Sequence, residues 1–275
     1  MGASLGYCSS ERALLGGFRA KTASGVYKNV LGSPVIPTQL EKLEAHASHL
    51  LDAFIKLRQR YSIIEPLLFD IAVVTTLGSG KRAVGFSILK DSLFLSCAQD
   101  IAKLTLDDHT RTPSLKNIIR ALADEALRLT LREQFAVWEI PQEEDETEPE
   151  ILEALRRLEL REEAQRRAQF DDLYSEATGL WSAFSDSSTI KSFRTIRDKV
   201  TAHTEVHLVV DKYQPVDIGT LGIKWGDVKA TLAQMQRLVE IIGMIIRNAG
   251  FAWESFDEQL TRASMGLWGV DEVAS

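Results

Sequence analysis

Apolar residues recur every three or four positions through most of the chain from residue 38 to 252, and this spacing predicts helices. Thr38 and Glu41 form a capping-box pattern that opens the first of them, which should run to about Tyr61. Ser114 is a suitable N-cap for a later one. The further helices are expected over residues 65–76, 82–104, 115–138, 150–178, 190–203 and 225–252. With only a short extended segment at 206–210, the pattern predicts an all-α bundle.

The predicted core takes its members from the apolar stripes of four of these helices. Residues at stripe positions should be largely buried in a single core: Phe86, Leu93, Cys97, Leu122, Phe193, Leu232, Val239 and Ile242.

Composition and charge divide the chain into segments. Residues 1–36 are rich in Gly and Ser and are expected to form an irregular segment, followed by one helical domain over 37–255 and a tail over 256–275. Within that domain, 141–149 is acidic and should be an exposed loop. Residues 150–178 should form an additional, long charged helix inserted in the domain. Three Glu–Arg pairs at i,i+4 spacing favour that helix: Glu153–Arg157, Glu162–Arg166 and Glu163–Arg167.

Composition excludes several classes of protein. The net charge is −7, so any contact with nucleic acid must come from a local basic patch. Cys8 and Cys97 are far apart and have no metal-ligand spacing, which fits a reducing cytoplasm. The first residues lack the cationic start of a secretory signal, and no apolar run reaches the ~18 residues of a membrane span. We therefore expect a cytoplasmic protein that does not enter the membrane.

The segment Arg197-Asp198-Lys199-Val200-Thr201-Ala202-His203 carries the residue types needed to cut RNA. An imidazole titrates near neutral pH and can move protons. A guanidinium has a permanent charge and a donor fork that suits a phosphoryl oxyanion. No metal and no cofactor is needed if the ribose 2′-hydroxyl is the nucleophile. On an ideal α-helix, Arg197 and His203 would be about 240° apart and roughly 9 Å apart along the axis, so they need not meet within one chain.

This segment resembles the Arg-x(4–6)-His signature of the HEPN superfamily, helical proteins that are often metal-independent ribonucleases. Three further segments look like the branch of that superfamily associated with phage abortive infection (AbiU-type). They are the end of the third helix at Ile101-Ala102-Lys103-Leu104, the loop Asp108-His109-Thr110-Arg111-Thr112-Pro113-Ser114-Leu115, and the entry into the last helix at Leu221-Gly222-Ile223-Lys224-Trp225-Gly226-Asp227-Val228. The resemblance runs from about residue 38 to 255 and implies a HEPN-like helical bundle.

The resemblance also implies roles for named residues. Arg197 would stabilise charge on the scissile phosphate, His203 would act as general base or acid, and Asp198 would orient one of them. HEPN sites are typically composite, so a homodimer is expected, with RNA as the substrate and an antitoxin protein as a further partner. The implied function is an RNA endonuclease acting in phage defence or as a toxin. Basic residues near the motif would suit an RNA backbone: Lys191, Arg194 and Lys199.

Other interpretations of the same residues stay open. The chain is alternatively a non-catalytic HEPN module that binds a nucleotide, RNA or a partner protein. A third possibility is a structural helical scaffold with the Arg197-Asp198 and His203 cluster salt-bridged into the core. Taken singly, Arg197 is alternatively a surface residue, or one paired with Asp198 or Glu205, and His203 is alternatively a residue favoured by the helix C-terminus. His203 and His207 have a spacing that binds zinc on a helix, but the segment around 206–210 is not expected to be helical and no third ligand is near.

Overall fold

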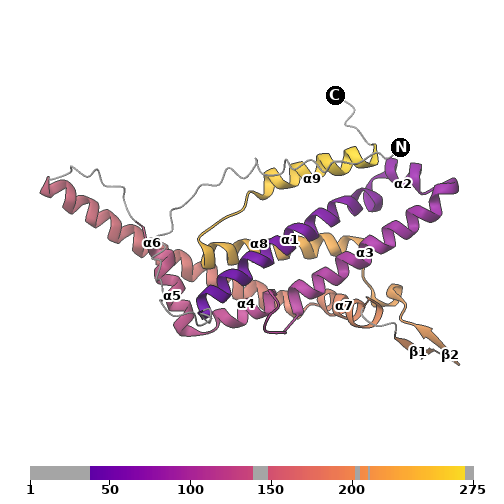
Figure 1. Ribbon diagram of the computed structural model, residues 1–275, viewed down its shortest axis with the longest axis horizontal. Coiled ribbons are helices and arrows are strands. Elements are labelled where there is room, and N and C mark those ends of the chain that lie inside the picture. Colours follow the sequence, from indigo (N-terminus) through magenta and orange to yellow (C-terminus); the bar gives the residue numbers. More distant parts are fainter. Residues whose placement is uncertain (1–37, 139–147, 202–204, 210, 270–275) are drawn as a thin grey trace, which may run out of the picture. The chain divides into compact units, whose positions relative to one another are not determined.

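The computed structural model describes residues 38–138, 148–201, 205–209 and 211–269, which are almost entirely helical (Figure 1). This confirms the predicted all-α class. The segment 1–36 and nearly all of the acidic loop 141–149 lie outside the described residues. The α-helices are α1 (Gln39–Phe69), α2 (Ile71–Leu77), α3 (Ala83–Leu106), α4 (Leu115–Leu122), α5 (Glu125–Ala136), α6 (Pro149–Ser185), α7 (Ser188–Ile196), α8 (Trp225–Arg247) and α9 (Trp253–Trp268). No helix in these ranges is both long enough and apolar enough to cross a bilayer.

Helix α1 begins at the predicted capping box. The Glu41 N–H donates to the Thr38 hydroxyl at 3.2 Å, and the Thr38 N–H donates to the Glu41 carboxylate at 2.7 Å. The helix does not stop near Tyr61 as predicted but continues through Pro66 to Phe69. Asp70 then caps α2 by accepting the N–H of Val73 at 3.0 Å. The predicted break between two helices is therefore displaced towards the C-terminus by the Asp70 cap.

Helix α9 supports α1 where proline interrupts the backbone bonding. Pro66 has no N–H to donate to the carbonyl of Ser62. The Ser264 hydroxyl of α9 donates to that carbonyl at 2.5 Å, and the indole N–H of Trp268 donates to the carbonyl of Ile63 at 3.0 Å. The boundary predicted at residue 255 thus falls inside a helix that packs against α1, and the described part of the predicted tail continues the helical domain.

The single helix predicted over 115–138 is two helices. Ser114 caps the first one as expected, accepting the N–H of Asn117 at 3.3 Å. Asp124 caps the second by accepting the N–H of Leu127 at 3.0 Å. The apolar residues keep their helical spacing through 115–138, but the second N-cap at Asp124 divides this stretch into α4 and α5.

Helix α6 is the predicted charged helix, and it is longer than expected. Its 37 residues include no buried side chain before Phe170, whereas the later residues Phe170, Ala177 and Phe184 are buried. Of the predicted ion pairs, Arg157 lies 3.7 Å from Glu153 and Arg167 lies 3.2 Å from Glu163. Arg166 instead donates to the backbone carbonyl of Phe135 at 2.7 Å and to Asn248 at 3.1 Å.

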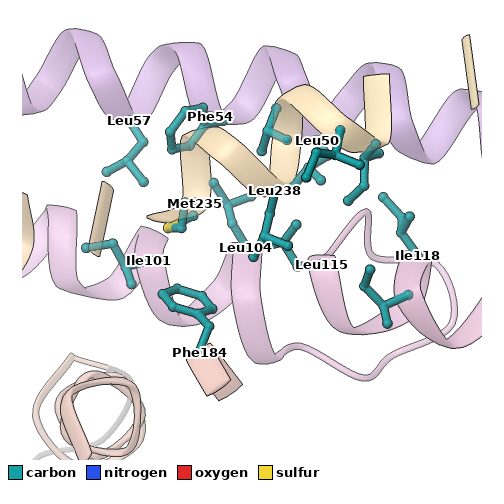
Figure 2. Close-up of a cluster of buried hydrophobic side chains, with 14 of the residues drawn as sticks. Leu50, Phe54, Leu57, Ile101, Leu104, Leu115, Ile118, Phe184, Met235 and Leu238 are labelled. Carbon is teal, nitrogen blue, oxygen red and sulfur yellow. The ribbon is translucent and has the colours of Figure 1, made fainter. Parts of the chain in front are cut away.

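The core lies where α1, α3, α4, α6 and α8 meet (Figure 2). Helix α1 packs against both α3 and α8, α8 packs against α6, and α7 packs against α3. Most of the predicted core is buried, namely Cys97, Leu122, Phe193, Leu232, Val239 and Ile242. Phe86 and Leu93 are only partly buried, because the first turns of α3 are largely exposed.

Two features interrupt the helical pattern between α7 and α8. The extended segment predicted at 206–210 is a strand, β1 (Val206–Val209), which pairs antiparallel with β2 (Lys212–Pro215). The sequence analysis did not predict β2. A short 3-10 helix, η3 (Ile218–Leu221), then leads into α8, which ends at Arg247 because Asn248 adopts a left-handed conformation.

Candidate functional site

Helix α7 sets the orientation of the predicted site. The Ser187 hydroxyl caps it by accepting the N–H of Ile190 at 3.2 Å. Its apolar residues are buried against the bundle: Ile190, Phe193 and Ile196. Because these residues turn inward towards α3, Lys191 and Arg194 are exposed on the outer face. Two of the predicted RNA-binding residues thus lie on one open face of the helix that leads to Arg197.

The helix changes its winding at Arg197. Residues Arg197–Thr201 form a π-helical turn, η2, rather than the α-helix that the sequence suggested. The Thr201 hydroxyl donates to the carbonyl of Arg197 at 3.0 Å and so bonds back along this turn. Single π-turns are rare in proteins and occur often at functional sites. The separation expected between Arg197 and His203 on an ideal α-helix therefore does not apply here.

Arg197 and Asp198 are joined by an ion pair. The Nε of Arg197 donates to Oδ1 of Asp198 at 2.7 Å, and the two side chains are 25% and 47% exposed. Within the described residues, no acceptor lies at hydrogen-bonding distance from the two terminal amino groups of Arg197. The pair therefore fixes the guanidinium from one edge and leaves the other edge available to a phosphate. This is also the pairing that the surface interpretation of Arg197 predicts.

Lys199 connects the π-turn to the segment that follows it. Its Nζ lies 3.1 Å from Oε2 of Glu205, and its carbonyl accepts the backbone N–H of Glu205 at 3.0 Å. Glu205 thus pairs with Lys199, whereas Asp198 pairs with Arg197. His203 belongs to residues 202–204, which lie outside the described part of the chain, so the structure does not place the predicted base.

The alternative of a helical zinc site is not supported. His207 lies on strand β1, so His203 and His207 cannot share one face of a helix. In the ranges that the structure describes, no group of three or more His, Cys, Asp or Glu residues is arranged to hold a metal ion.

A cavity that sequence reasoning did not anticipate lies between α3 and the segment from η3 to the start of α8. Its volume is about 380 Å³, and its walls come from α3, η3, Ile223 and the first residue of α8, Trp225. Trp225 belongs to a segment that resembles the family, but nothing in the sequence assigned it a role. The only signal was an aromatic residue at a helix start, which is as common in a core as in a site.

A larger cavity, of about 530 Å³, lies between α1, α8 and α9 and does not contain the motif. Each basic side chain that lines it is in an ion pair: Arg58 with Asp257, Lys229 with Glu65, and Arg237 with Glu176 and Glu240. An anionic ligand there would have to displace a carboxylate. We therefore place the candidate site at η2, where exposed cations lie on the adjoining turns.

A comparison with known families agrees with the helical fold. The family model described as AbiU2, a HEPN family, matches residues 40–267, from the start of α1 into the last turn of α9. No curated protein and no solved structure matches the chain. The match includes the charged helix α6, the π-turn and the segment that leads into α8. Because it covers most of the sequence, the chain belongs to the AbiU2 family of HEPN proteins.

Proposed function

We propose that this protein is a metal-independent RNA endonuclease that acts in phage defence or as a toxin. The observation that carries the proposal is the arrangement around Arg197. Its guanidinium is held at one edge by Asp198, its terminal amino groups have no acceptor among the described residues, and exposed Lys191 and Arg194 lie on the helix before it. A cation presented in this way suits a phosphodiester.

In the proposed reaction, the ribose 2′-hydroxyl attacks the adjacent phosphorus. His203 accepts the hydroxyl proton or donates a proton to the leaving 5′-oxygen. The bond from phosphorus to the 5′-oxygen breaks, and the products are a 2′,3′-cyclic phosphate and a 5′-hydroxyl. Arg197 stabilises the negative charge that builds on the phosphoryl oxygens, and Asp198 keeps the guanidinium in place.

The predicted RNA-binding residues contribute unequally in this proposal. Lys191 and Arg194 are exposed and are free to meet a phosphate backbone, whereas Lys199 must first exchange its Glu205 partner. Lys191 and Arg194 therefore carry most of the salt-dependent affinity. A local patch of this kind is compatible with the overall net charge of −7.

The protein acts as a homodimer in this proposal, so that motifs from two copies face one cleft. The first turns of α3 carry exposed apolar side chains, with Val84 70% exposed and Ile88 62% exposed. Further along, α3 packs against η2. A second copy seated on the start of α3 would thus cover apolar surface and approach the candidate site. An antitoxin protein is a further partner in the toxin context.

The test is to incubate purified protein with cellular RNA in EDTA, with Arg197→Ala and His203→Ala variants beside it. The control is Arg247→Ala, which removes an exposed arginine at the end of α8. EDTA-insensitive cutting that only the two motif variants lose supports the endonuclease. RNA binding without cutting by the wild type would instead support a non-catalytic HEPN module.

A further inference from the structure

The cavity between α3 and η3 has the size and lining of a small-ligand site. Its volume of about 380 Å³ lies within the range of pockets that hold small molecules. The walls are apolar and aromatic apart from a single carboxylate: Asp91, Phe94, Leu95, Ile218, Ile223 and Trp225. A few polar groups in an apolar pocket typically fix the orientation of a flat ligand.

The cavity shares its walls with the elements that hold Arg197. Helix α3, which supplies Asp91 and Phe94, packs against both α7 and η2. The Ser192 hydroxyl of α7 donates to the carbonyl of Leu221 at 3.1 Å and so ties α7 to η3, which forms another wall. The cavity and Arg197 are thus linked through α3 and α7.

The aromatic wall is held in place by defined contacts. Phe94 and Trp225 meet edge to face with their ring centroids 4.5 Å apart. The Lys90 ammonium lies 5.2 Å from the Trp225 ring centroid and 5.8 Å from that of Phe86. This places a positive charge next to a rigid apolar wall, a combination that binds bases and backbone of single-stranded nucleic acid.

Asp91 determines which base the cavity would prefer. Its side chain is exposed at the wall and accepts a long hydrogen bond of 3.4 Å from Ser87, and an ionised carboxylate only accepts. Guanine presents two adjacent N–H donors on its Watson–Crick edge, which match the two carboxylate oxygens. Adenine and cytosine present one amino group beside an acceptor, and uracil presents one N–H between two acceptors.

We propose that this cavity binds one base of a single-stranded RNA and selects guanine through the carboxylate of Asp91. The proposal rests on RNA being the substrate, as proposed above. It adds a specificity-determining residue that takes no part in bond cleavage. The base bound here would set which phosphate is presented to Arg197.

The test measures binding with RNA that cannot be cut. Fluorescence anisotropy would be followed with labelled 2′-O-methyl hexanucleotides, UUGUUU, UUAUUU, UUCUUU and UUUUUU, on the wild type, Asp91→Asn and Asp52→Asn. Asp52 is an exposed carboxylate on α1 and is the matched control. We expect the guanine-containing strand to bind about tenfold tighter than the others, as hydrogen bonds to a charged group allow. Asp91→Asn should lose this preference, and Asp52→Asn should keep it.

Equal binding of all four strands, or an unchanged guanine preference in Asp91→Asn, would overturn the proposal. The same measurement on Arg197→Ala separates it from the endonuclease proposal. A guanine preference that Arg197→Ala keeps while it loses cleavage supports both proposals, whereas a guanine preference in a wild type that does not cut RNA supports the base site and counts against the nuclease. Cleavage by the wild type without any guanine preference supports the nuclease and counts against the base site.

Discussion

The hydroxyl of Ser264 donates to the carbonyl of Ser62 at 2.5 Å, and this is the carbonyl that Pro66 leaves without a helical donor. A helix near the end of the described chain thus completes the hydrogen bonding of the first one. Ser264 is buried, whereas Ser62 is partly buried and lines the cavity between α1, α8 and α9.

Replacing this hydroxyl should destabilise the fold. We expect Ser264→Ala to lower the free energy of unfolding by about 1 kcal/mol, since the hydrogen bond between α9 and the Ser62 carbonyl is lost. The measurement is urea unfolding followed by circular dichroism. Thr261→Ala is the control, because the Thr261 hydroxyl bonds only within α9 and is exposed. Equal losses of unfolding free energy in both variants would show that the hydrogen bond between α9 and α1 contributes no more to stability than one within α9.

Replacing Arg197 by lysine should separate cleavage from binding. Lysine keeps the charge but cannot hold Asp198 with Nε and offer two further amino groups to a phosphate. We expect cleavage to fall by about 10²–10³-fold, as when a transition-state donor is lost. RNA affinity should change far less. The readouts are single-turnover cleavage and RNA binding on the same preparation, and a parallel loss in both would contradict the role given to Arg197.

The rate of cleavage should depend on pH through His203. If this imidazole moves protons, the rate should change around the ordinary histidine pKa of about 6.5. The measurement is the cleavage rate from about pH 5 to 8. A flat profile over this range is the outcome that would rule out His203 as acid or base.

The proposed dimer should depend on the exposed start of α3. We expect Ile88→Asp to shift sedimentation from dimer towards monomer and to reduce cleavage with it, since a charge cannot be buried there without a partner. Ile151→Asp is the matched control, because Ile151 is an exposed isoleucine on the first turn of α6. A wild-type protein that is monomeric at every concentration would refute the composite site.

Cys97 should resist alkylation in the native protein. It is buried, and burial raises the pKa of its thiol to about 12. The thiolate is the reactive form, so at pH 8 the native thiol stays protonated, whereas unfolding restores the ordinary pKa. With Cys8 replaced by serine, we expect iodoacetamide to label Cys97 only in denaturant. Rapid labelling of the folded protein would contradict its place in the core.

The sequence was informative where a single local rule decides the structure. The Thr38 capping box, the Ser114 cap and the stripe positions of Cys97 and Leu122 depend on side-chain spacing along one helix, and all are present. The charged helix was predicted from its i,i+4 pairs in the same way. The Arg197 motif was identified by the order of its residues, which needs no knowledge of packing.

The sequence was uninformative where distant segments decide the structure. Helix α1 continues through Pro66 with α9 bonding to the carbonyls nearby, and no local pattern connects residues 62 and 264. The π-turn at Arg197 cannot be distinguished by spacing from an α-turn over so few residues. The cavity at Asp91 and Trp225 requires α3 and η3 to be neighbours, which only the folded chain provides.

The first turns of α6, before Arg166, have little tertiary support. The helix has no buried side chain before Phe170, and an isolated helix of this kind is only marginally stable in water. The opening of these turns should therefore be uncoupled from global unfolding and should respond to salt, which screens the surface ion pairs of α6. These turns can therefore unfold while the core stays folded. Whether they are helical then depends on what they contact, not on the rest of the fold.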